Sequence, residues 1–102
     1  MKLKKPEDCI SLEDIRNEID KIDKSIISMF AERNKFVQAI VRFKFDTAGI
    51  RAEARKNEVI SQRKRWADEK GLDAGTFAQI YETLIESNIR QELEIFKSKQ
   101  KK

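Results

Sequence analysis

One apolar stripe of unusual length dominates the first half of the sequence. Ser11 followed by Asp14 resembles a capping box, which marks the start of a helix. From there apolar side chains recur every three or four residues, at Ile15, Ile19, Ile22, Ile26, Met29, Val37 and Ile40, and the pattern continues to about Phe45. We therefore expect one helix of about 35 residues, roughly 52 Å long, which is around twice the diameter of a compact globule of this mass.

A helix of that length is difficult to cover within a chain of 102 residues. No other segment is long enough to shield the stripe, and a lone chain of this size buries only about two thirds of its unfolded surface. We therefore expect an intertwined homodimer, in which two long helices pack on each other and on the shorter helices of the partner. Residues 1–102 are expected to form a single domain in each chain.

Two further helices are expected after a loop at residues 46–49. The first would run from about Ala52 to Lys70, where Gly71 ends it. Its expected apolar positions are Ala54, Val59, Ile60 and Trp66. Asp73 would cap the last helix, whose apolar positions are Phe77, Ile80, Tyr81, Leu84, Ile85, Ile89, Leu93 and Phe96. That helix would fray into a basic tail from about Lys97, and the expected fold is all-α with three helices, the first very long.

The composition excludes several kinds of active site. The chain has no histidine, which excludes a Ser-His-Asp triad and a His-Glu-x-x-His zinc helix. Cys9 is the one cysteine, so neither an internal disulfide nor a cysteine-rich metal site can form. No run of about 18 apolar residues is present, and the basic start is not followed by an apolar segment. We therefore expect a cytoplasmic protein with no membrane segment.

Two cations interrupt the long stripe at core-facing positions. Continuing the spacing from Met29 leads to Arg33 and then, beyond Ile40, to Lys44. Eleven residues make about three helical turns, so the two side chains should share a face about 16 Å apart. A buried unpaired charge is costly, so each cation needs either a glutamate, water or an anionic ligand.

The last helix carries a matching pair of polar residues. Asn88 and Glu92 fall at i and i+4 on its apolar side. Either Glu92 forms a salt bridge with one of the cations, or both residues line a polar cavity inside the bundle. Arg16 and Arg55 lie near the edges of their stripes and by themselves would be taken for surface residues.

The net charge of +4 favours anionic partners without identifying them. Arg63, Lys64 and Arg65 splay around their helix rather than forming a stripe. The basic tail lacks interleaved aromatic residues, so we expect no nucleic-acid binding. Trp66 and Tyr81 are expected in the core.

Taken together, these residues resemble a known family. The pattern consists of Ile15-Arg16-x-x-Ile19-Asp20-x-Ile22-Asp23, then Arg33, Lys44 and Arg55, and Gly71-Leu72-Asp73-Ala74 before the last helix. It resembles the all-helical chorismate mutases. Pro6-Glu7-Asp8-Cys9 and Arg42-Phe43-Lys44 are most similar to the isochorismate pyruvate-lyase branch, the enzyme of salicylate formation for siderophores.

The resemblance implies a homodimer with two equivalent sites for isochorismate or chorismate. In each site Arg16 would come from one subunit, and Arg33, Lys44 and Arg55 from the other. They would bind the two carboxylates and the ether oxygen of the substrate, with Asn88 nearby. The step would be pericyclic and would need no nucleophile, metal or redox cofactor, only a dianion held in a reactive conformer. Arginine suits carboxylates, and lysine suits a single ether oxygen.

Two positions depart from the family pattern. Lys56 stands where many mutases have a glutamate that accepts a hydrogen bond from the C4 hydroxyl of chorismate, which favours the lyase. Glu92 stands where bacterial members usually have a glutamine that donates to the ether oxygen, and a one-residue shift would place Gln91 there instead. Burial would raise the pKa of Glu92 and Lys44 would lower it.

Three functions therefore stay open. The chain could be mainly a lyase, with secondary mutase activity, or mainly a chorismate mutase. It could also be a non-catalytic dimeric helical module, in which Arg33, Lys44 and Glu92 form an internal salt-bridge network. Residues 46–51, next to Lys44, could close over a ligand, and Gly49 would permit the movement.

Overall fold

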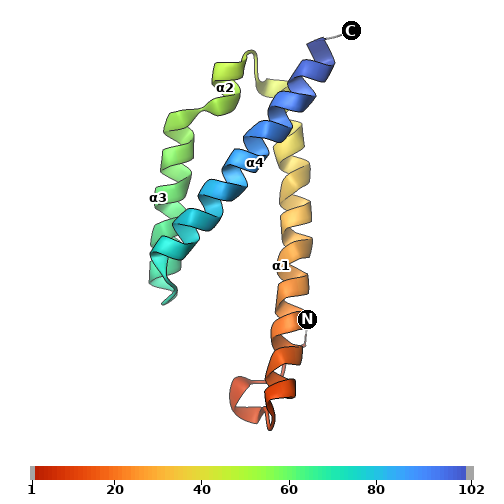
Figure 1. The fold of residues 1–102 in the computed structure, drawn as a ribbon, viewed down its shortest axis with the longest axis vertical. Coiled ribbons are helices and arrows are strands. Elements are labelled where there is room, and N and C mark those ends of the chain that lie inside the picture. The colour runs from red at the N-terminus through yellow and green to blue at the C-terminus, as the bar shows by residue number, and fades with distance from the viewer. Residues whose placement is uncertain (1, 101–102) are drawn as a thin grey trace. The chain divides into compact units, whose positions relative to one another are not determined.

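The computed structural model of the protein describes residues 2–100. Its regular elements are η1 (Pro6–Asp8), α1 (Leu12–Ile40), η2 (Val41–Phe43), α2 (Thr47–Arg51), α3 (Glu53–Glu69) and α4 (Ala74–Gln100) (Figure 1). The described chain is thus all-helical, as predicted, and none of its helices is both long and apolar enough to cross a membrane. The expected fraying from Lys97 is wrong, because α4 continues to Gln100, while the last two residues of the expected tail lie outside the described residues.

Contacts divide the chain into two compact units, Met1–Lys35 and Phe36–Lys102. The first holds η1 and most of α1. The second holds the last turn of α1 and all the later elements.

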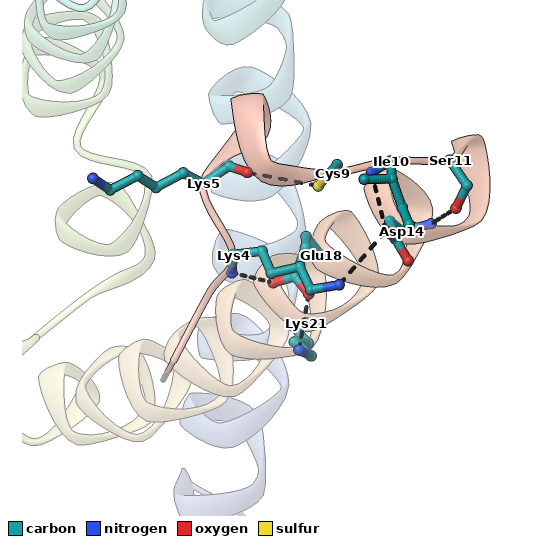
Figure 2. Close-up of polar contacts among 8 residues, drawn as sticks. All are labelled: Lys4, Lys5, Cys9, Ile10, Ser11, Asp14, Glu18 and Lys21. Carbon is teal, nitrogen blue, oxygen red and sulfur yellow. Dashed lines mark hydrogen bonds and ion pairs between the residues drawn. The ribbon is translucent and has the colours of Figure 1, made fainter.

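In the first unit, α1 begins at the predicted capping box (Figure 2). The Ser11 hydroxyl accepts a hydrogen bond from the Asp14 backbone N–H at 3.0 Å, and the Asp14 carboxylate accepts one from the Ile10 N–H at 3.1 Å. This second bond is the main reason why the pKa of Asp14 lies below its usual value. The exchange satisfies backbone donors that a helix start leaves unpaired, which explains why the helix begins at Leu12.

The N-terminal segment folds back along the first turns of α1 (Figure 2). The Lys4 backbone N–H donates to Glu18 Oε2 at 3.1 Å, and the Lys4 ammonium lies 3.5 Å from the Asp14 carboxylate. Glu18 also accepts a 2.9 Å hydrogen bond from Lys21, which is the largest cause of its lowered pKa. These contacts hold the segment on the side of the helix that carries Asp14 and Glu18.

The predicted apolar stripe is not covered within this unit. None of residues 2–35 is buried. Ile15, Ile19, Ile22 and Ile26 remain 44%, 50%, 38% and 44% exposed. Most of the stability of a helix in a protein comes from packing of its apolar face rather than from the helix propensity of its residues. An exposed apolar face of this kind is typical of a surface that packs against another apolar surface.

The long helix ends earlier than predicted. Regular α-helix ends at Ile40, Val41–Phe43 form a 3₁₀ turn, and Lys44 follows in extended backbone at φ −103° and ψ 133°. Val37 and Val41 are buried, at 7% and 3% exposed. The tighter turn satisfies carbonyls at the helix end while keeping Val41 inside. The expectation that Lys44 shares a helix face with Arg33 is therefore wrong.

The core of the second unit lies between α3 and α4 (Figure 1). Ile50, Val59, Ile85 and Ile89 are buried there, and Ile60, Leu93 and Phe96 pack against them. The six other than Ile50 were expected at apolar helix positions.

The loop expected at residues 46–49 is mostly helical. The Asp46 carboxylate caps α2 by accepting a 2.7 Å hydrogen bond from the Gly49 N–H. Ile50, 3% exposed, anchors α2 to α4 through the core. Ala52 then adopts a left-handed conformation, with φ 37° and ψ 57°, and separates α2 from α3.

Both predicted signals at the turn between α3 and α4 are confirmed. Gly71 has φ 75° and donates to the Asp68 carbonyl at 3.0 Å, while the Leu72 N–H donates to the Ala67 carbonyl at 2.9 Å. This is the Schellman pattern, in which a left-handed glycine ends the helix. Asp73 caps α4 by accepting hydrogen bonds from the Thr76 N–H and hydroxyl at 2.9 and 2.6 Å, which lower its pKa.

Trp66 does not lie in the core as expected. Its side chain is 49% exposed, and the Arg63 guanidinium lies 4.6 Å above the ring centroid. On α3 the buried apolar positions are Val59 and Ala67, with Trp66 beside Ala67 at the flank. Ala54 is exposed as well, whereas Tyr81 is half-buried.

Candidate active site

The six predicted site residues divide between the two units. Arg16 and Arg33 belong to Met1–Lys35, while Lys44, Arg55, Asn88 and Glu92 belong to Phe36–Lys102.

Lys44 follows directly on η2, which packs against α4. Its backbone N–H donates to the Val41 carbonyl at 3.1 Å. Its aliphatic stem passes close to α2, since a Cβ at Gly49 would lie 3.9 Å from Lys44 Cδ. The side chain is half-buried, and within residues 2–100 no ion pair of its ammonium is observed. Lys44 is thus a lysine without an ion pair in the described chain, as the predicted binding role for an anionic group requires.

Asn88 and Glu92 lie one turn apart on α4 and are only 8% and 7% exposed. They share the face of the helix that carries Ile85 and Ile89, so their predicted place on the apolar side is confirmed. Burial of an amide and a carboxyl among aliphatic side chains is costly unless both are well partnered. Such a polar pair is typical of a binding or catalytic site inside a helical bundle.

Arg55 is exposed near the start of α3. Its guanidinium lies 2.7 Å from the Glu58 carboxylate, three residues later on the same helix. Exposed pairs of this kind contribute little stability, so Glu58 does not hold Arg55 firmly. A dianionic ligand could compete for it.

Lys56, the position that departs from the mutase pattern, is bound to α4. Its ammonium lies 2.6 Å from Glu86 Oε1 and 3.9 Å from Glu82 Oε1, and its side chain is only 13% exposed. The hydrogen bond from Lys56 lowers the pKa of Glu86, and the same bond raises the pKa of Lys56. Lys56 stands out in the sequence but its partners do not, although Glu82 and Glu86 stand at i and i+4 on α4 and thus share a face.

Arg16 is exposed on α1. Asp14 and Glu18 stand two residues to either side, about 160° away around the helix, and Lys4 engages both. Within the described chain no ion pair of Arg16 is observed. Arg33, further along α1, is half-buried.

The residue types suit a small dianion. Arginines bind carboxylates through two parallel hydrogen bonds, and a lysine provides a compact charge. The amide of Asn88 and the carboxyl of Glu92 add hydrogen-bonding groups in an apolar setting. Residues 2–100 contain no group of three or more metal-ligating side chains, of the kinds histidine, cysteine, aspartate and glutamate, placed to hold an ion.

Comparison with known proteins agrees with these residue types. The family model for chorismate mutase type II matches residues 15–93, which include all six predicted site residues. A Pseudomonas aeruginosa protein named isochorismate pyruvate lyase is 44% identical over 92 residues, which make up 86% of this chain and 91% of that protein. Both matches support the conclusion that this protein is an enzyme. The chain belongs to the chorismate mutase type II family.

Proposed function

We propose that the protein is an isochorismate pyruvate-lyase, which converts isochorismate to salicylate and pyruvate without a cofactor, with secondary chorismate mutase activity. The observation that carries the proposal is that Lys44 is half-buried, follows a turn packed on α4, and has no ion pair within the described chain. The likeness to a protein named isochorismate pyruvate lyase supports the choice of substrate.

The protein contributes to the reaction mainly by binding the substrate and by stabilising charge. The ether C–O bond breaks, one ring hydrogen passes to the methylene carbon of the enolpyruvyl group, and the ring becomes aromatic. The atoms of isochorismate thereby balance those of salicylate and pyruvate, with no water, oxidant or external base. The protein must hold a reactive conformer and stabilise negative charge on the ether oxygen as the bond breaks.

Each polar residue has a role in this proposal. Arg16, Arg33 and Arg55 bind the two carboxylates. Lys44 donates to the ether oxygen, and Glu92, in its protonated form, donates to the same oxygen from α4. Asn88 lies one turn from Glu92 and orients the substrate.

We also propose that the site is completed in a homodimer. The exposed isoleucine face of α1 supports this, because no residue in 2–35 is buried and a second copy offers a matching apolar face. In the dimer, Arg16 enters the site formed by Lys44, Asn88 and Glu92 of the other chain.

The Lys56–Glu86 pair favours isochorismate over chorismate as the main substrate. Many mutases have a glutamate for the C4 hydroxyl at the position that Lys56 occupies here, and Lys56 is instead bonded to Glu86. Isochorismate carries its hydroxyl elsewhere on the ring. Chorismate mutase as the main activity remains the second candidate, since the family model that matches the chain bears that name.

The test is direct. The purified protein is incubated with isochorismate and with chorismate, and salicylate, pyruvate and prephenate are measured. We expect salicylate and pyruvate in equal amounts from isochorismate, and slower prephenate formation from chorismate. In Lys44→Ala we expect turnover to fall by at least about a hundredfold, in the range seen when a stabilising donor is removed.

Lys64→Ala, an exposed lysine on α3, is the matched control and should keep full activity. Circular dichroism and sedimentation check that each variant is folded and associated as the wild type is. Prephenate as the faster product would make the protein a mutase. No turnover of either substrate by the folded wild type, with Lys44→Ala losing stability, would favour a non-catalytic module.

A further inference from the structure

The turn between α3 and α4 borders a cavity of about 210 Å³, whose surface is mainly apolar with two cations at it. Its lining includes Arg63, Trp66, Lys70, Leu72, Phe77 and Tyr81, all within the unit Phe36–Lys102. Tyr81 and Glu92 are eleven residues apart on α4, about 16 Å along its axis. The cavity is therefore separate from the candidate active site.

Aromatic rings and a guanidinium form its main surfaces. Arg63 lies 4.6 Å above the Trp66 ring centroid and 5.7 Å from that of Tyr81. Trp66, which sequence analysis placed in the core, instead leaves half of its surface open. Arg63 also donates to the Gln62 side chain, but a guanidinium carries five N–H groups, so donors remain for a ligand.

The lining carries positive charge only. Arg63 and Lys70 contribute two cations, and among residues 2–100 no aspartate or glutamate belongs to the lining. On α3 the pocket residues recur at 63, 66 and 67, and Lys70 caps the end of this helix, whereas Asp68 and Glu69 stand on other faces. The Asp73 carboxylate is bound to Thr76 at the start of α4.

We propose that this cavity binds a small aromatic carboxylate. The carboxylate pairs with Arg63 and Lys70, and the ring lies against Trp66 and Phe77, since stacked rings beside a planar guanidinium provide both contacts. The volume lies below the roughly 300–1,000 Å³ of pockets for drug-sized ligands, which suits a single substituted ring.

This site is distinct from the proposed active site. The proposed lyase reaction releases an aromatic carboxylate, which is the class of ligand proposed for the cavity. Binding can nevertheless be measured without turnover, and its outcome is independent of which reaction the protein performs.

Trp66 makes the test simple, because it is the chain's one tryptophan. Benzoate is titrated into the purified protein at constant ionic strength, and the fluorescence of Trp66 is followed. We expect saturable quenching by benzoate, weaker binding of cyclohexanecarboxylate, which lacks the aromatic ring, and no effect of benzyl alcohol, which lacks the charge. Arg63→Ala should raise the benzoate concentration at half-saturation about tenfold or more, and Arg63→Lys, which keeps the charge but not the planar fork, by less.

Two controls locate the signal. Lys64→Ala, next to Arg63 but outside the lining, and Lys44→Ala in the candidate active site should both titrate as the wild type does. The inference is overturned if benzoate causes no saturable quenching, if Arg63→Ala titrates unchanged, or if Lys44→Ala abolishes the signal. It is equally overturned if the Trp66 emission shifts when the protein is diluted but does not change when benzoate is added. A second copy of the chain would then fill the cavity.

Discussion

At the scale of single residues, Glu92 differs from the other aspartates and glutamates among residues 2–100 because it is buried. It is 7% exposed on the core face of α4, whereas Glu82 on the same helix is exposed. In the proposed mechanism Glu92 donates a hydrogen bond to the ether oxygen, and only its protonated form can do so. The pH of the solution should then control the rate.

We therefore expect lyase turnover to rise as the pH falls and Glu92 becomes protonated. Glu92→Gln should flatten this profile, because an amide donates at every pH. The measurement is turnover against pH for both forms, with circular dichroism at each pH. Loss of activity at every pH in Glu92→Gln would contradict the donor role, and Gln91→Ala is the control for the alternative register.

Residue-level signals in the sequence were reliable where the chemistry is local. The Ser11–Asp14 box, the Asp73 cap and the left-handed Gly71 depend on neighbouring backbone groups alone. The position of Lys44 was not predictable in this way. Val41 is buried in a 3₁₀ turn, and Lys44 therefore lies outside the helix. The spacing of apolar residues cannot predict this, because it does not depend on tertiary packing.

At the scale of elements, the Lys56–Glu86 ion pair joins α3 to α4 at 2.6 Å. The hydrogen bond from Lys56 lowers the pKa of Glu86 below its unfolded value, so the pair stabilises the fold above that value, about pH 4.3, and the contribution disappears as the pH falls through the folded pKa. The raised pKa of Lys56 makes stability depend on pH in the opposite direction. It adds stability below its unfolded pKa, about 10.4, and this is lost as the pH rises through the higher folded value.

Glu86→Gln should therefore lower the urea midpoint of unfolding at pH 7, and the difference from wild type should vanish in acid. Glu82→Gln is the matched control, since Glu82 lies 3.9 Å from Lys56 and is more exposed, and its effect should be much smaller. Equal effects of the two variants, or a difference that persists in acid, would show that the pair does not link the helices.

The elements themselves were predicted well except at the end of α1 and around α2. The spacing of apolar residues located α3 and α4 and most of their core. The segment at 47–51 has too few residues for a periodic pattern, and its helix depends on the Asp46 cap and on the burial of Ile50 against α4. That anchoring also argues against a freely moving lid over Lys44.

At the scale of the whole molecule, the decisive question is whether one chain holds a complete site. The isoleucine face of α1 is open, and Arg16 and Lys44 belong to different compact units. The proposed dimer brings Arg16 of one chain to Lys44 of the other. The length of the predicted first helix suggested association, because no second element could cover it, but this length could not show which residues meet.

Mixing two inactive variants decides this point. Arg16→Ala and Lys44→Ala are unfolded together, refolded together and assayed for lyase activity, with each variant refolded alone as the control. In a shared site, each mixed dimer has one site with both residues intact and one with neither. Random pairing makes half of the dimers mixed, so about a quarter of the wild-type activity should return. If both residues serve a site within one chain, every site in the mixture lacks one of them, and activity stays at the level of the separate variants.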